Sequence, residues 1–217
     1  MIVDANLGAN KANFFLARSV SVNALIGKSG EVENRVTVRY QNNSPSVSWP
    51  GGPYKDYVRF LVPVDADLVS FDIGDGRRPK LSETLTADTI ASVSADQFLV
   101  FKSRELAFNP QSSNSGLLSF GTFFEVPVGQ SRTVSFVYRP NYRLNFTSPS
   151  PRLTFNLLKQ PGTGADPFEL VVDYPSFLKV VGDSWPGDAK VLVLPQKLDY
   201  NTSLTQDRKI RIDFVSD

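Results

Sequence analysis

The chain has 217 residues, with 23 Lys and Arg against 22 Asp and Glu, and it contains neither Cys nor His. The absence of Cys and His excludes disulfides, Ser-His-Asp and Cys-His nucleophile systems and the usual zinc sites. The two charge signs alternate along the sequence, which argues against a nucleic-acid-binding surface because such a surface needs clustered positive charge. Sixteen Phe, seven Tyr, 15 Pro and 14 Gly favour strands joined by turns, so the expected fold class is all-β.

The first predicted elements form a hairpin. From Phe14 to Ile26 the even positions are mostly apolar, and from Val32 to Tyr40 apolar and polar residues alternate again. A period of two is typical of a half-buried strand, and the intervening Gly27-Lys28-Ser29-Gly30 predicts the turn. The Gly-Lys-Ser is not interpreted as a phosphate loop, because that motif needs an earlier glycine and a following helix.

More strands are predicted along the first 140 residues, near 56–62, 67–73, 97–102, 118–126 and 134–138. The stretch 77–95 is polar and weakly patterned. No segment with helical periodicity is long enough for a parallel crossover, so antiparallel sheets joined by short turns are expected.

A domain boundary is predicted after Pro140, because residues 145–151 are rich in Ser, Pro and Thr. Beyond it, strands are expected near 153–157, 168–173, 176–181, 190–194 and 208–215. This spacing is typical of a small sandwich. The sequence therefore predicts two consecutive antiparallel, immunoglobulin-like β-sandwiches: a larger domain at 1–140 with an N-terminal connecting segment, and a smaller one at 141–217.

Four aromatic residues are candidates for a binding surface: Trp49, Tyr54, Tyr57 and Trp185. Both tryptophans lie in Ser-Trp-Pro-Gly loops, and aromatic side chains on loops can stack on sugar rings. The alternative is that these residues pack inward and close the ends of the sandwiches.

Four acidic residues are weak candidates for a Ca²⁺ site or a glycosidase pair: Asp65, Asp67, Asp72 and Asp75. The strand-like residues 68–71 separate them, which favours structural turns. Ser176 and Lys179 have the Ser-x-x-Lys spacing of acyl-enzymes, but a strand places residues three apart on opposite faces. No catalytic residue, metal or cofactor is therefore predicted.

Several stretches together resemble one family. They are VDANLGANKANFFLARSV (3–20), VRYQNNSPS followed by WPGGPYKDYVRFLVP (38–63), FGTFFEVPVGQSRTVSFVYRP (120–140) and LLKQPGTG (157–164). In this order they resemble the C-terminal region of the bacterial domain of unknown function 4012 family. The resemblance implies a piece of a large cell-envelope protein whose transmembrane helix lies upstream, with Met1 a cloning methionine. It implies an extracytoplasmic location at the cell surface, and it carries over no catalytic residue.

The expected function is that of a non-catalytic, extracytoplasmic β-sandwich module that serves as a spacer or an interaction surface. No apolar run is long enough to span a bilayer, so direct membrane insertion of this chain is not expected. Expected partners are cell-surface polysaccharide or another envelope protein, and not nucleic acid. Two alternatives are a carbohydrate-binding module that uses Trp49 and Tyr54, and a glycan-active enzyme that uses carboxylates.

Overall fold

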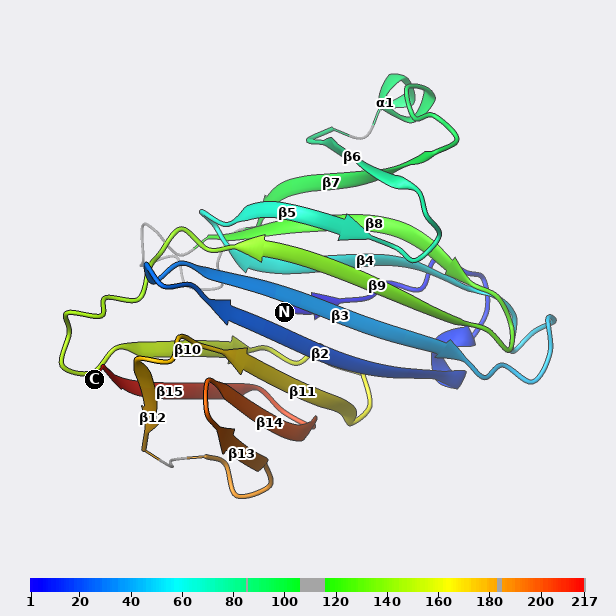
Figure 1. Cartoon of the computed structure of the whole chain (residues 1–217). Helices are drawn as coiled ribbons and strands as arrows, with labels where there is room; N and C mark the ends of the chain where they lie inside the picture. Colours follow the sequence, from blue (N-terminus) through cyan, green and yellow to red (C-terminus); the bar gives the residue numbers. More distant parts are fainter. Residues whose placement is uncertain (85, 106–115, 183–184, 217) are drawn as a thin grey trace.

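A computed structural model describes residues 1–84, 86–105, 116–182 and 185–216 (Figure 1). Strands dominate these ranges, which confirms the all-β expectation in this coarse form. Helix within them is confined to the 3₁₀ turn Ala12–Phe15 and to α1, Ala87–Ala91. No helix in the described ranges is long and apolar enough to cross a membrane.

The strands form three sheets. In the order in which its strands lie side by side, the five-stranded sheet consists of β1 (Ile2–Val3), β4 (Tyr54–Pro63), β8 (Leu117–Val126), β7 (Gln97–Glu105) and β6 (Arg78–Ser82). In the same spatial order, the seven-stranded sheet consists of β13 (Lys190–Leu194), β14 (Lys197–Leu204), β11 (Asp166–Asp173), β2 (Leu16–Ile26), β3 (Val32–Asn42), β9 (Ser131–Arg139) and β5 (Asp67–Asp72). The three-stranded sheet consists of β10 (Arg152–Leu157), β15 (Arg208–Ser216) and β12 (Leu178–Val181).

The seven-stranded sheet is the common wall of the molecule, and the two smaller sheets cover different parts of it (Figure 1). Phe60 of β4 stacks on Phe136 of β9 with ring centroids 4.8 Å apart, which joins the five-stranded sheet to this wall. Tyr174, directly after β11, meets Phe214 of β15 at 5.3 Å, which joins the three-stranded sheet to it. The core therefore extends along one face of the seven-stranded sheet.

Period-two alternation explains which side chains form this inner face. The even-numbered residues of β2, β3 and β11 point inward, and their apolar members are mostly buried. Strand pairing aligns them in rows, such as Phe168 beside Val20, then Val38 and Val134. The predicted hairpin is confirmed, because β2 and β3 pair antiparallel on either side of Gly27.

Two strand pairs are parallel, so the expectation of purely antiparallel sheets is wrong at these places. β6 pairs with β7, and the segment that contains α1 supplies the crossover. β2 pairs with β11, and most of the chain forms that connection. Strands from both sides of residue 140 thus share one sheet, and two immunoglobulin-like sandwiches are not confirmed. The division at 140 stays a prediction.

Candidate functional site

The two smaller sheets meet at a seam over the centre of the common wall. β1 and β10 are edge strands of these sheets. The side chain of Gln160, shortly after β10, donates to the carbonyl of Asp4 and accepts from its N–H, both at 2.8 Å. An amide side chain therefore makes the hydrogen bonds that a neighbouring strand would make, and it ties the two sheets together at one point.

A cavity of about 380 Å³, the seam cavity, lies at this junction. The seven-stranded sheet contributes Val20, Val22, Asn34, Val36, Phe136, Tyr138, Phe168 and Leu204. The remaining wall is made by Met1, Ile2, Phe60 to Pro63, Leu117, Pro140, Tyr142 and Thr154 to Leu158. Val36 remains partly accessible although its same-face neighbour Val38 is fully buried, because its side chain borders the cavity.

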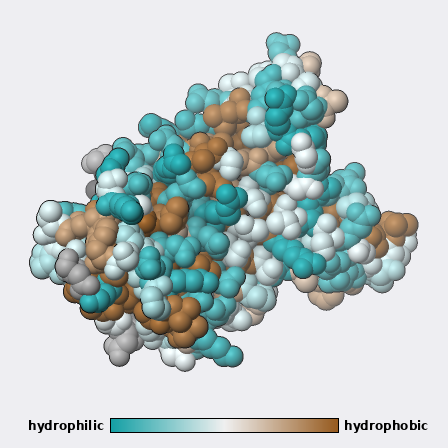
Figure 2. All heavy atoms as spheres, viewed as in Figure 1, coloured by the Kyte–Doolittle hydropathy of each residue, from teal (hydrophilic) through white to brown (hydrophobic). Residues whose placement is uncertain are grey.

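The mouth of the seam cavity is marked by four lining residues that are also exposed: Pro63, Tyr142, Asn156 and Leu158. Tyr142 and Leu158 are 44% and 43% exposed, whereas most of the other lining residues are buried or half-buried. Figure 2 shows that apolar residues on the viewed face form several separate patches between polar ones.

The lining is apolar and aromatic, and the described residues that form it include no Asp, Glu, Lys or Arg. Its polar side chains are Asn34, Tyr138, Tyr142, Thr154 and Asn156. Asn34 is 3% exposed and, within the described part of the chain, its Oδ1 has no hydrogen-bond partner. Buried polar atoms are nearly always hydrogen-bonded in folded proteins, so this orphaned acceptor is the unusual feature of the site.

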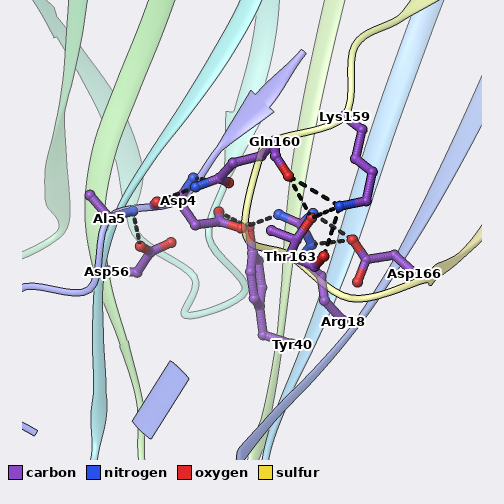
Figure 3. Close-up of polar contacts among 9 residues, drawn as sticks. All are labelled: Asp4, Ala5, Arg18, Tyr40, Asp56, Lys159, Gln160, Thr163 and Asp166. Atoms are coloured by element: carbon purple, nitrogen blue, oxygen red, sulfur yellow. Dashed lines mark hydrogen bonds and ion pairs between the residues drawn. The ribbon is translucent and has the colours of Figure 1, made fainter. Parts of the chain in front are cut away.

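A buried polar cluster includes Arg18, Asp4 and Asp166 (Figure 3). Arg18 of β2 donates to Oδ2 of Asp166 through Nε at 3.0 Å and Nη2 at 2.5 Å, and its Nη1 donates to Asp4. The three side chains are between 7% and 9% exposed. Burial alone would lower the pKa of Arg18, but the charges of Asp4 and Asp166 outweigh it, so that the pKa is raised.

The same cluster contains a third carboxyl group, that of Asp56 on β4. Its Oδ1 accepts from the N–H of Ala5 at 2.8 Å, and Tyr40 donates to Asp4 at 2.7 Å. Burial, reinforced by the nearby charge of Asp4, raises the pKa of Asp56 to about 9. Asp56 is therefore neutral at pH 7, which lets Asp4 and Asp56 share one buried environment.

The cluster continues the strands that line the cavity. Arg18 lies two residues before Val20, and Asp166 two residues before Phe168, each on the same strand face. The cluster therefore joins β1, β2 and β11 beside the cavity. Arg18, Asp4, Asp166 and Tyr40 are paired with one another, whereas Oδ2 of Asp56 has no hydrogen-bond partner among the described residues. The pairs connect strands of two sheets.

The four predicted aromatic residues do not form one surface. Trp49 is 73% exposed on the loop before β4, whereas Tyr54 is 2% exposed in the core. Tyr57 lies on the outer face of the five-stranded sheet with Phe123, with ring centroids 4.5 Å apart. Trp185 packs against Tyr200 of β14 at 6.1 Å. A platform made of Trp49 and Tyr54 is therefore not available, and Trp49 does not close the end of a sandwich.

The four acidic candidates are also separated. Asp75 pairs with Arg77 at 2.8 Å, and Asp72 accepts from the N–H of Gly74 at 2.7 Å. Asp65 and Asp67 are exposed at the turn into β5 and at its start. Among the residues that the structure describes, no group of three or more Asp or Glu could hold a metal ion.

Sequence reasoning missed the residues that matter most here, although a signal was present. Arg18, Asn34 and Asp56 each occupy an inward-facing position in an otherwise apolar alternation. A polar residue in the apolar register of a central strand must be paired or must face a cavity, because an unpaired buried polar group is costly. Arg18 is paired, Asp56 is paired through Oδ1 but, among the described residues, not through Oδ2, and Asn34 lines the cavity.

No protein-family model matches the sequence, and no curated protein matches it. The structure is similar to that of a candidate nutrient binding protein from Legionella pneumophila, at a TM-score of 0.55 and 8% identity, over 98% of this chain and 70% of that one. For a candidate protease from Parabacteroides distasonis the TM-score is 0.42 and the sequence identity 10%, over 93% of this chain and 40% of that one. For an M1 zinc metallopeptidase from Deinococcus radiodurans the TM-score is 0.37 and the sequence identity 9%, over 92% of this chain and 42% of that one. At 8% identity the similarity to the first of these structures concerns the fold alone.

Proposed function

We propose that the chain is a non-catalytic, extracytoplasmic β module that binds a small molecule in the seam cavity. The observation that carries the proposal is the cavity, about 380 Å³ in volume, walled by all three sheets and open between Tyr142 and Leu158. Small-molecule sites are typically apolar clefts of roughly 300–1,000 Å³ with a few convergent polar groups. The similarity to a candidate nutrient binding protein is in keeping with a ligand-binding role.

The non-catalytic part of the proposal rests on the chemistry of the lining. Its titratable side chains are Tyr138 and Tyr142, and burial raises the pKa of both. The α-amino group of Met1 also belongs to the lining; burial lowers its pKa to about 6, and it is held by a hydrogen bond to the carbonyl of Leu61 at 3.0 Å. A general acid or base works best when its pKa lies near the working pH, so a raised phenol pKa makes both residues poor proton-transfer groups. Such a site can bind a ligand, but none of its described side chains is suited to transfer a proton to or from it.

The extracytoplasmic part rests on the resemblance to the domain of unknown function 4012 family. Cell-surface polysaccharide or another envelope protein is the partner proposed for the outer surface of the module. If protease is added to intact cells that produce the native protein, we expect the protease to cleave the chain. If the chain is cleaved only after the cells are lysed, it lies inside the cell, which would contradict this part of the proposal.

The cavity is tested with a neutral reporter dye, N-phenyl-1-naphthylamine, whose fluorescence rises in apolar surroundings. We expect one saturable site in the wild-type chain. Val36→Phe places a ring into the cavity from the centre of the seven-stranded sheet, so dye affinity is expected to fall at least about tenfold. The larger side chain occupies free space, so the melting temperature is expected to stay level or rise.

The matched control is Val171→Phe, the same exchange on the outer face of β11. It adds the same ring without touching the cavity, and dye affinity is expected to match that of the wild type. Absence of saturable dye binding to the wild-type chain contradicts the proposal. Equal affinity in a folded Val36→Phe variant contradicts it too, because the dye then binds elsewhere.

A further inference from the structure

We infer that the ligand of the seam cavity is an uncharged, ring-bearing molecule whose hydroxyl or N–H group donates a hydrogen bond to Oδ1 of Asn34. This rests on the proposed function and names the chemical class that the site accepts. Three properties of the lining carry it: the absence of charged side chains among the described residues, the aromatic walls and the orphaned amide oxygen.

The absence of charge argues for a neutral ligand. Within the described part of the chain, no Asp, Glu, Lys or Arg side chain lines the cavity. The α-amino group of Met1 belongs to the lining, but burial lowers its pKa to about 6, so it is mostly neutral at pH 7. A charged group moved from water into such surroundings loses its hydration and gains no side-chain counter-charge, which is strongly unfavourable. A carboxylate, phosphate or ammonium on the part of the ligand that enters is therefore selected against.

The aromatic walls argue for a ring. Phe60 and Phe136 stack at 4.8 Å with planes 7° apart, and Tyr138 lies 5.5 Å from Phe136. Phe155 and Phe168 face the same space from β10 and β11. Aromatic rings prefer offset-stacked and edge-to-face neighbours, so a flat ring gains more here than a branched aliphatic chain of the same area.

The amide of Asn34 argues for a donor on that ring. Asn34 lies on the inner face of β3, beside Ala24 of β2 and Tyr138 of β9. Its Oδ1 has no partner among the described residues, and leaving a buried acceptor unpaired is unfavourable. Oδ1 is buried, so the amide must turn its oxygen toward a molecule bound in the cavity. A ligand hydroxyl or N–H would then complete this hydrogen bond, whereas an ether or a hydrocarbon would leave it open.

The test compares four probes that share one ring system: naphthalene, 1-methoxynaphthalene, 1-naphthol and 1-naphthoate. Against the wild-type chain we expect 1-naphthol to bind about threefold to tenfold more tightly than 1-methoxynaphthalene, the range of one neutral hydrogen bond. We expect 1-naphthoate, the anion, to bind most weakly of the four. Competition with N-phenyl-1-naphthylamine measures each affinity.

The matched variant is Asn34→Leu, which keeps the size of the side chain and removes the amide. We expect it to bind 1-naphthol and 1-methoxynaphthalene equally, and to melt at a higher temperature because it no longer buries an unpaired acceptor. The wild-type comparison of the two probes needs no variant, so the inference is testable even if Asn34→Leu does not fold.

The outcomes separate this inference from the proposed function. If all neutral probes bind the wild-type chain equally, or 1-naphthoate binds best, the inference is wrong while the cavity remains a binding site. If no probe displaces the dye and no dye binds, the proposed function itself fails.

Discussion

Arg18 of β2 and Asp166 of β11 form a buried ion pair across parallel strands that are far apart in the sequence. The guanidinium also pairs with Asp4, beside β1, so one cation holds together segments of two sheets. Removal of one partner from such a cluster leaves an uncompensated charge in the interior, which is more costly than the pair itself is stabilising.

Arg18→Met is therefore expected to lower the free energy of unfolding by about 3–5 kcal/mol, because Asp4 and Asp166 lose their counter-charge. Urea denaturation followed by circular dichroism measures it. The control is Arg152→Met, which breaks the exposed pair with Asp213 and should change stability far less, because solvent screens exposed ion pairs. Equal losses in the two variants would mean that burial adds nothing to the Arg18 pairs.

Asp56→Asn is expected to change how stability depends on pH. The pKa of Asp56 is about 9 in the folded chain and about 3.9 when unfolded, so between these values only the folded state holds the proton. Stability therefore falls as pH rises through this window, by up to about 1.4 kcal/mol per pH unit. The variant lacks this proton and keeps an oxygen for the N–H of Ala5.

The measurement is the difference in unfolding free energy between Asp56→Asn and the wild type at pH 5, 6, 7 and 8. Other titrating groups contribute equally to both chains, so the difference isolates Asp56. We expect the advantage of the variant to grow with pH. A difference that stays constant across this range would show that Asp56 is already ionised in the folded chain.

Gly30→Ala is expected to destabilise the chain more than Gly129→Ala. Both glycines have positive φ, 85° and 74°, so each exchange carries about 1–3 kcal/mol of backbone strain. A Cβ on Gly30 would also lie 2.2 Å from the carbonyl oxygen of Leu144, whereas a Cβ on Gly129 meets open space. Thermal unfolding compares them, and similar melting temperatures would show that the Leu144 segment moves aside freely.

The two tryptophans are expected to report different surroundings. Trp49 is 73% exposed and Trp185 is half-buried against Tyr200. The variant Trp185→Phe, which retains Trp49, should emit at longer wavelength and be quenched more by acrylamide than Trp49→Phe. Loss of the exposed Trp49 ring should change stability by no more than about 0.5 kcal/mol. A large loss would assign Trp49 a packing role that its exposure does not suggest.

Strong alternation predicted most strands close to their true positions, as the β2 and β3 hairpin illustrates. β14 was missed, because its polar stretch Asp199 to Ser203 weakens the strand pattern and it follows Gln196 at a positive φ of 63°. β6 was missed within the polar stretch 77–95, which also contains α1. In β6 polar, exposed residues removed the periodicity on which the prediction depends. In β14 Leu198, Tyr200 and Leu204 keep the period of two, but the polar residues between them hid the strand.

The pairing of strands was beyond the reach of the sequence pattern. Alternation tells which residues of β2 face inward, but it does not tell that Val20 lies beside Phe168. The seam cavity depends on that pairing, because it forms where strands from distant parts of the chain converge. In the sequence Asn34 stands out as a polar residue at an inward position of an apolar alternation. The structure supplies the reason, because Asn34 lines the seam cavity.

The parallel pairing of β2 and β11 also constrains the order in which the protein acquires its fold. Arg18 and Asp166 are 148 positions apart, so during synthesis β2 emerges from the ribosome long before its second neighbour exists. Until then one edge of a central, largely apolar strand has no partner, and such an edge invites pairing with other chains. Contacts between residues far apart in the sequence slow folding, so we expect the β2 edge to stay unpaired for longer. During that time the chain is prone to aggregation and can be bound by chaperones.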